Sequence, residues 1–253
     1  MINRFDSETH QLTLSEDGSY TAYSQEYEEH YHSTRDGALK ESLLKHVYPA
    51  FSLYERDEVV ILDICYGLGF NTLATLLYIK ENALDIKVKI YSPELDAKLI
   101  ASLKEFHYPK EFEEFREIIE NLCDSGFYED ENLTIELFIG DAREYIKKFE
   151  NHFDIVYQDA FSPKVNPILW TKEYFSDIAH AMKEDGVLTT YSIAFRTRLA
   201  LYENGFNLYI NRGEEYRDAT IATKRELPGI EKVAMEHKIK CNEGVCSLRD
   251  ADV

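Results

Sequence analysis

The sequence is poor in cysteine, in long apolar runs and in positive charge. Its four cysteines, at positions 65, 123, 241 and 246, are too few and too scattered for a disulfide scaffold in 253 residues. Cys241 and Cys246 have no second cysteine pair, so we expect reduced thiols and no metal site. No apolar run approaches the roughly 20 residues that a membrane-spanning helix needs, which excludes an integral membrane protein of the helical class.

The N-terminal stretch MINRFDSETHQ has no charged segment followed by an apolar one. We therefore expect no secretory signal and a cytoplasmic location. Lysine and arginine number 28 against 47 aspartates and glutamates, a net charge of −19 that by itself argues against a nucleic-acid partner. The charge is uneven, however. Residues 110–131 hold nine acids and two bases, whereas residues 191–225 hold six bases and four acids, so a local basic surface is compatible with the acidic whole.

What is present is an alternation of predicted strands and helices. Apolar patterns predict strands over 58–64, 87–94, 133–142, 153–161 and 186–192, and helices over 71–83, 96–106, 110–122, 143–149, 171–183 and 195–203. Paired strands follow near 206–223. Such an order implies right-handed crossovers and a mostly parallel sheet, closed by an antiparallel hairpin.

The N-terminal part has a different pattern. Residues 5–25 alternate loosely around Asp17-Gly18, which predicts a β-hairpin. Apolar residues after Gly37 recur at helical spacing, and we expect Pro49 to end that helix.

The stretch LDICYGLGFN, residues 62–71, is typical of a turn that leads from a buried strand into a helix beside a nucleotide. Gly67 and Gly69 allow close approach of a ligand and positive φ angles, and Asp63 can accept hydrogen bonds. Cys65 occupies a position where glycine is usual, so we expect a negative φ there. An ordinary strand-to-helix turn is the alternative.

Three further strands end in acids. Glu94 can accept two ribose hydroxyls, as in dinucleotide enzymes, and Asp141 suits an adenine amino group. Together with Cys65, which would crowd a phosphate, these acids favour an adenosine joined to an amino acid over a dinucleotide. Asp159 ends the fourth strand beside the expected position of a reactive methyl group, where it could hold an amine and take its proton. A structural acid is the alternative.

The stretch DAFSPKVNPILWTKEYF, residues 159–175, resembles the D-x-F-x-P-x-x-N-P-x-x-W signature of the tRNA 5-(aminomethyl)-2-thiouridylate methyltransferases, the methyl-transferring half of the bifunctional MnmC proteins. YEEHYHSTRDGALKESLLKHVY, the turn at 62–71, YSPE and FIGDA match the same family in order. The resemblance covers roughly residues 20–225.

This resemblance implies an α/β fold, a Rossmann-like S-adenosylmethionine methyltransferase sheet with a small N-terminal β-addition. We expect the addition over 1–50, the methyltransferase domain over 51–225 and a C-terminal extension over 226–253. The implied reaction is methylation of the aminomethyl group of 5-aminomethyl-2-thiouridine at the tRNA wobble position, which gives 5-methylaminomethyl-2-thiouridine. S-adenosyl-L-methionine is the implied donor and tRNA the implied partner.

The family's residues fall on definite positions here. Asp159 is the implied catalytic residue. The implied cofactor site comprises Asp63, Cys65, Gly67, Gly69, Glu94 and Asp141. The implied substrate site comprises Tyr31, Phe161, Pro163, Lys164, Asn166, Pro167, Arg196 and Arg198. Contact with tRNA is also expected among Arg35, Arg212 and Arg217, and His30 and His32 are expected near the substrate. Trp170, the single tryptophan, is expected to be a packing residue.

The chain has no second dinucleotide fingerprint, so no FAD is expected in it. A separate oxidase or an upstream tRNA-modifying complex is then expected to supply the amine. Two other functions stay open. An aminopropyltransferase of the spermidine-synthase type would use decarboxylated S-adenosylmethionine and suits an acidic protein, and a non-catalytic scaffold is suggested only by Cys65.

Overall fold

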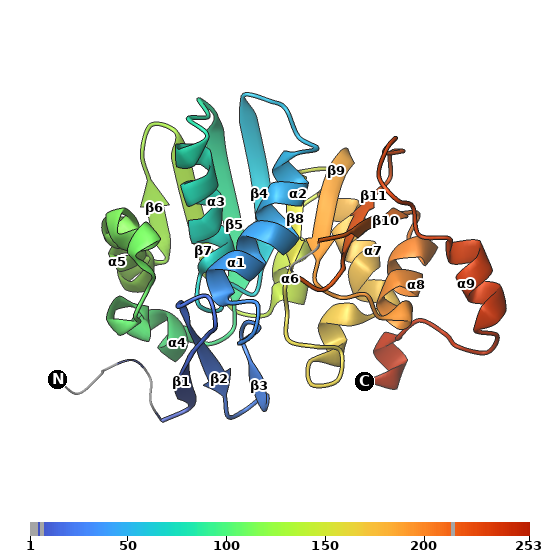
Figure 1. Cartoon of the computed structure of the whole chain (residues 1–253), viewed down its shortest axis with the longest axis horizontal. Coiled ribbons are helices and arrows are strands. Elements are labelled where there is room, and N and C mark those ends of the chain that lie inside the picture. Colours follow the sequence, from blue (N-terminus) through green and yellow to red (C-terminus); the bar gives the residue numbers. More distant parts are fainter. Residues whose placement is uncertain (1–4, 6–7, 214–215) are drawn as a thin grey trace.

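The computed structural model describes residues 5, 8–213 and 216–253, and its centre is an eight-stranded sheet (Figure 1). The strand order is β10-β11-β9-β8-β4-β5-β7-β6. The strands are β4 (Glu58–Ile64), β5 (Lys87–Glu94), β6 (Phe127–Glu129), β7 (Leu133–Ile139), β8 (Phe153–Gln158), β9 (Met182–Thr190), β10 (Asn207–Asn211) and β11 (Ala219–Thr223). Strands β4, β5, β7, β8 and β9 pair in parallel, while β11 runs antiparallel between β9 and β10, and β6 runs antiparallel at the other edge. The mostly parallel sheet with an antiparallel closing hairpin is thus confirmed.

The order of strands reverses between β4 and β8. From β4 the chain builds outward through β5 to β7, and it then returns to β8 on the opposite side of β4 and continues to β9. In open α/β sheets, ligands bind outside the carboxyl ends of the strands at such a reversal. The ends of β4, β5, β7 and β8 are therefore where a site is expected.

Helices cover both faces of the sheet. Strand β4 alternates between two core layers, with Val59 and Ile61 in one and Val60 and Leu62 in the other, because successive side chains point to opposite faces. The first layer packs under α1 (Ala38–Ser42), η1 (Leu43–Val47), α2 (Tyr48–Phe51), α3 (Phe70–Glu81), α4 (Ala97–Ser102), η2 (Leu103–Glu105), η3 (Lys110–Phe115) and α5 (Arg116–Ser125). The second packs under α6 (Ala142–Ile146), η4 (Pro167–Trp170), α7 (Lys172–Ala181) and α8 (Phe195–Glu203).

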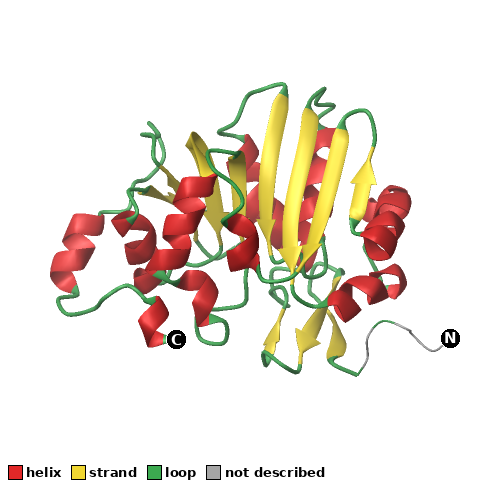
Figure 2. Cartoon of the chain, turned by 180° about the vertical axis from the view of Figure 1, so that it is seen from behind, coloured by secondary structure: helices red, strands yellow, loops and turns green. Residues whose placement is uncertain are grey.

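A small antiparallel sheet, β1 (His10–Leu14), β2 (Tyr20–Ser24) and β3 (Glu29–His30), lies beyond the carboxyl ends of the long strands (Figure 2). Strands β1 and β2 form the predicted hairpin, with Gly18 at a φ of 85°. Residues 1–4, 6 and 7 of the expected N-terminal addition lie outside the described residues, as do residues 214 and 215 between β10 and β11.

The prediction that Pro49 ends the first helix is wrong. The helix changes to a π-helical turn before Pro49 and then continues past it. Residues Leu43–Val47 form a π-helical turn in which the Tyr48 N–H donates to the Leu43 carbonyl, and α2 continues through Pro49. Pro49 has no N–H to offer the Leu44 carbonyl. That carbonyl instead accepts the Asn211 amide Nδ2 at 2.8 Å, so a residue of β10 replaces the missing donor.

The C-terminal residues fold back over the second helical layer. Lys232 bridges to Tyr209 of β10, and α9 (Met235–Cys241), which was not predicted, contacts α8. The chain then reaches α7, where the Lys172 N–H donates to the Leu248 carbonyl at 2.8 Å, and ends in η5 (Asp250–Asp252). Within the described part of the chain, none of the helices is both long and apolar enough to cross a bilayer.

Candidate functional site

A cavity of about 860 Å³ lies between the small N-terminal sheet and the carboxyl ends of the parallel strands. Among the described residues that line it, seven carry carboxylates and Lys98 is the one lysine or arginine. The acids are Glu26, Glu29, Glu41, Glu94, Asp96, Asp141 and Asp159. A surface this acidic favours a cationic ligand and disfavours phosphate.

The turn after β4 is built from left-handed residues. Cys65 has a φ of 64°, so the expectation of a negative φ is wrong. Hydrogen bonds hold this turn, from the Tyr66 N–H to the Pro93 carbonyl at 3.3 Å and from the Gly69 N–H to the Tyr66 carbonyl at 2.8 Å. A non-glycine residue in this region costs about 1–2 kcal/mol, so the turn stores strain at Cys65.

Gly67 is required by its surroundings. Its φ is 54°, and a Cβ atom there would lie 3.0 Å from Cδ1 of Tyr31. Its N–H donates to Oε2 of Glu94 at 2.8 Å. Because a carboxylate already occupies this amide, the turn is unsuited to a pyrophosphate, which uses such N–H groups in dinucleotide enzymes.

Glu94 ends β5 at the centre of the cavity wall. Its Oε1 accepts the N–H groups of Leu95 and Asp96 at 2.8 and 2.9 Å. Burial raises the pKa of the carboxyl, and the three backbone donors only partly oppose that effect. The carboxylate is held in one orientation and keeps further lone pairs for a ligand.

Asp141 begins α6 at the end of β7. Its Oδ1 accepts the Arg143 N–H at 2.8 Å, which is a helix N-cap, and its side chain is exposed to the cavity. The preceding Gly140 N–H donates to the Glu94 carbonyl at 2.8 Å and so joins the ends of β7 and β5.

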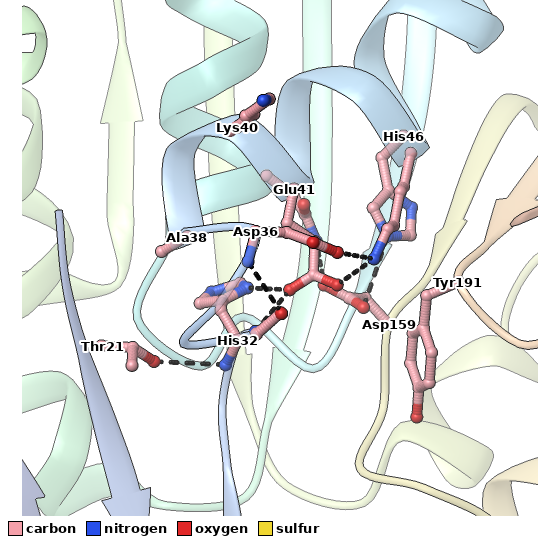
Figure 3. Close-up of polar contacts among 12 residues, drawn as sticks. Thr21, His32, Asp36, Ala38, Lys40, Glu41, His46, Asp159 and Tyr191 are labelled. Atoms are coloured by element: carbon pink, nitrogen blue, oxygen red, sulfur yellow. Dashed lines mark hydrogen bonds and ion pairs between the residues drawn. The ribbon is translucent and has the colours of Figure 1, made fainter. Parts of the chain in front are cut away.

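Asp159 follows β8 and has polar neighbours on two sides. Its Oδ2 accepts Nδ2 of Asn71 in α3 at 2.8 Å, and its Oδ1 lies 3.3 Å from Nε2 of His46 in η1 (Figure 3). Burial acts to raise the pKa of the Asp159 carboxyl, but the nearby His46 and His32 imidazoles and the Asn71 amide outweigh it. The pKa therefore lies below its ordinary value.

Behind Asp159 lies a buried group of charges from the N-terminal segment. Lys45 Nζ donates to Glu41 Oε1 at 2.6 Å and to Asp36 Oδ2 at 3.0 Å, and all three side chains are at most a tenth exposed. Glu41 lines the cavity and lies 3.8 Å from Nδ1 of His32, whose pKa is lowered by burial. Figure 3 shows His32, Asp36 and Glu41 of this segment together with Asp159.

Aromatic rings form another part of the cavity wall. Phe161 stacks on Tyr27 with centroids 4.6 Å apart and contacts Tyr31 at 4.8 Å. Glu29 of β3 accepts both the N–H and the hydroxyl of Ser162 and thereby joins the small sheet to the loop after β8. Trp170 is 1% exposed and donates to the Phe161 carbonyl at 2.8 Å, which confirms its packing role.

The structure brings together only part of the predicted site. Cavity-lining positions are taken by Tyr31, Cys65, Gly67, Glu94, Asp141, Asp159, Phe161 and Asn166. The lining residues do not include Asp63, Gly69, Pro163, Lys164, Pro167, Arg196 and Arg198. His30 and His32 both line the cavity.

The predicted residues away from the cavity differ in their surroundings. Asp63 is 1% exposed and accepts the Thr72 hydroxyl at 2.7 Å, and burial raises its pKa to about 7. Arg198 is buried and donates from Nε to the Thr220 hydroxyl at 3.0 Å. Lys164 and Arg196 are exposed at the surface.

Sequence reasoning missed His46 and Asn71. Both are buried polar residues in helices that were read by their apolar pattern alone. A usable signal existed for His46, because Glu41, Lys45 and His46 place charge and polarity on a short helix that otherwise packs into the core.

A family model described as an S-adenosyl-L-methionine-dependent methyltransferase matches residues 107–225. Among solved structures, the crystal structure of MnmC2 from Aquifex aeolicus is similar, with a TM-score of 0.80 and 33% identity. That similarity covers 91% of this chain and 74% of the other.

Curated relatives extend the comparison. An uncharacterized protein of Methanocaldococcus jannaschii, MJ0670, is 35% identical over 79% of this chain and 55% of its own length. The tRNA 5-methylaminomethyl-2-thiouridine biosynthesis bifunctional protein MnmC of Azoarcus sp. is 30% identical over 78% of this chain and 32% of its own. The chain thus spans between a third and about half of the length of these two relatives. On the similarity to MnmC2, the chain belongs to the MnmC methyltransferase family, which is S-adenosyl-L-methionine-dependent and has a Rossmann-like fold.

Proposed function

We propose that this protein N-methylates the aminomethyl group of 5-aminomethyl-2-thiouridine at the tRNA wobble position, giving 5-methylaminomethyl-2-thiouridine. The observation that carries the proposal is an ionised carboxylate, Asp159, fixed on the wall of an acidic cavity beside the glycine turn, Glu94 and Asp141. The name of the Azoarcus relative, which includes 5-methylaminomethyl-2-thiouridine biosynthesis, supports this choice of substrate.

The cavity suits S-adenosyl-L-methionine, which supplies a methyl group on a positively charged sulfonium. We assign Glu94 to the ribose hydroxyls; the assignment is supported by a carboxylate that three backbone N–H groups orient and that retains lone pairs. Asp141 is exposed to the same cavity and is assigned to the adenine amino group. Cys65 and Gly67 form the adjoining wall. Asp63 and Gly69 contribute indirectly, by shaping the turn.

Asp159 is assigned the handling of the substrate amine. Its carboxylate can accept an N–H of the amine, orient the nitrogen lone pair toward the methyl group, and take up the released proton directly or through water. Glu41 and the other cavity carboxylates favour entry of the amine as a cation, which gives up one proton to Asp159 or to water before its nitrogen attacks the methyl group. Phe161, Tyr31 and Asn166 line the cavity and are assigned to the modified base, and Pro163 and Pro167 stiffen the loop that carries Phe161 and Asn166.

The surface that receives tRNA is part of the proposal. Exposed Lys164 lies on the loop next to the cavity-lining Ser162 and Asn166, and exposed Arg196 lies near the start of α8. We assign both to phosphate contact. Arg198 is buried within the fold, so we assign it to support of the site and not to direct contact.

The test uses the purified protein, S-adenosyl-L-methionine with a labelled methyl group, and tRNA that carries 5-aminomethyl-2-thiouridine. Nucleoside mass spectrometry is expected to show the methylaminomethyl product, and tRNA without the aminomethyl group is expected to stay unlabelled. In the source organism, deletion of the gene is expected to cause the aminomethyl nucleoside to accumulate. Unchanged nucleosides in both experiments would refute the proposed substrate.

Calorimetry separates the remaining alternatives. We expect S-adenosyl-L-methionine to bind more tightly than its decarboxylated form. Preference for the decarboxylated form would favour the aminopropyltransferase, and binding of neither form would favour the scaffold.

A further inference from the structure

The π-helical turn η1 delivers one side chain to the reacting carboxylate. His46 is fully buried within η1, and its Nε2 lies 3.3 Å from Oδ1 of Asp159. Its Nδ1 lies 3.1 Å from the hydroxyl oxygen of Thr189 in β9. Single π-helical turns within helices occur frequently at functional sites, where they redirect a side chain.

The contact between His46 and Asp159 is close but not aligned. Nε2 of His46 makes no hydrogen bond within the described part of the chain, although it is buried. A carboxylate only accepts hydrogen bonds, so the tautomer that suits this geometry carries its proton on Nε2 and accepts the Thr189 hydroxyl at Nδ1. Catalytic hydrogen bonds are often poorly aligned before substrate binds and improve when it is present.

The two oxygens of Asp159 thus face different elements. Asn71 of α3 holds Oδ2, and His46 of η1 faces Oδ1. We propose that His46 is a positioning residue for the proposed methyl transfer: through Nε2 it fixes the angle at which the Asp159 carboxylate faces the cavity. This inference rests on the proposed function only in giving Asp159 a role in the reaction. The contact between His46 and Asp159 does not depend on that function.

Removal of His46 also removes an imidazole that lowers the pKa of the Asp159 carboxyl. The groups that face this carboxylate are His32 from the segment after β3, Asp63 and Cys65 at the end of β4, and Tyr191 at the end of β9. Glu41 lies behind His32. Most of these groups are acids or neutral, so without His46 the effect of burial on the Asp159 pKa is less opposed and the carboxyl titrates at a higher pH.

His46→Leu and His46→Gln form the test. Leucine removes both nitrogens, whereas glutamine places an amide N–H near the position of Nε2. His180→Leu is the matched control, because it makes the same change on an exposed surface of α7. We expect His46→Leu to lower kcat by up to about 100-fold with little change in the KM for S-adenosyl-L-methionine, as displacement of a reacting group by about 1 Å can do. We expect His46→Gln to recover part of that loss and His180→Leu to behave as the parent.

A second readout does not depend on methyl transfer. With ¹³C-labelled aspartate, the Asp159 carboxyl signal is assigned by its loss in Asp159→Asn and followed through a pH titration. We expect it to titrate at higher pH in His46→Leu than in the parent. An unchanged midpoint, or equal kcat in His46→Leu and the parent, overturns the inference. Should the parent fail to methylate the tRNA, the proposed function is refuted while the titration still decides whether His46 controls Asp159.

Discussion

The backbone N–H of Gly67 donates to the Glu94 carboxylate at 2.8 Å, and this bond joins the turn after β4 to the end of β5. Two neighbouring strands of the sheet are thereby locked at the cavity wall. The bond also occupies a turn N–H that would otherwise attract an anion. A turn of the kind that binds pyrophosphate in dinucleotide enzymes therefore lies beside an acidic cavity wall here.

We predict that Glu94→Ala weakens binding of S-adenosyl-L-methionine by about 1.5–3 kcal/mol, the usual scale for hydrogen bonds to a charged group. Isothermal titration calorimetry measures the change, with the exposed Glu113→Ala as control. The substitution also leaves the Gly67 N–H without its hydrogen-bond partner. Circular dichroism is therefore needed to show that the variant is folded. A dissociation constant equal to that of the parent would contradict the ribose assignment.

Asp159→Asn should reduce methyl transfer by at least about 100-fold, because a neutral amide cannot take the proton of the amine. Binding of S-adenosyl-L-methionine should stay close to that of the parent. Single-turnover assays and calorimetry on the same preparation separate the two quantities, and the exposed Asp85→Asn controls for the loss of a negative charge. Equal loss of binding and transfer would show that Asp159 is a cofactor ligand or a structural acid.

The strain at Cys65 predicts an inverted order of stability for two substitutions. Alanine and glycine both remove the thiol, but only glycine accepts a φ of 64° without a steric penalty. We expect Cys65→Gly to be more stable than Cys65→Ala by about 1 kcal/mol, the reverse of the order at a position with negative φ. Chemical denaturation of the cofactor-free variants measures the difference, and greater stability of the alanine variant would mean that the turn is not left-handed at this residue.

Asp63 predicts a pH dependence of stability. Its pKa is raised from 3.8 to about 7 in the folded protein, so the folded state binds more protons between these values. Its contribution to stability is therefore present below about pH 4 and is lost as the pH rises to about 7. The Asp63→Asn variant does not lose stability in this way. Its free energy of unfolding should therefore rise relative to that of the parent between about pH 4 and about pH 7.

Denaturation of the cofactor-free proteins at several pH values checks the prediction for Asp63. The exposed Asp85→Asn should follow the parent at every pH. A constant difference between Asp63→Asn and the parent would indicate that the carboxyl keeps one protonation state throughout.

The sheet and the acids at its strand ends could be predicted because each follows from local pattern. Buried parallel strands are continuous apolar runs, and the residue after such a run lies at the carboxyl edge. Glu94, Asp141 and Asp159 were located in this way, and all three line one cavity.

The conformation of Cys65 and the partner that His46 meets could not be predicted in this way, because tertiary contacts decide both. Hydrogen bonds to Pro93 and within the turn impose the positive φ of Cys65. The π-helical turn that carries His46 depends on Asn211, more than 150 residues away, which supplies the donor that Pro49 lacks. No window of neighbouring residues contains that information.

The acidity of the cavity has a consequence for the end of the catalytic cycle. In the proposed reaction the donor enters with a sulfonium charge and leaves with an uncharged thioether sulfur, while the cavity carboxylates other than Asp159 keep their charge. The Coulomb attraction between the acidic cavity wall and the donor therefore falls when the methyl group is transferred. The fall is largest where solvent is excluded, because the effective dielectric constant is lowest there. The chemistry itself weakens the hold on the spent molecule, and exchange for a fresh one is favoured by charge alone.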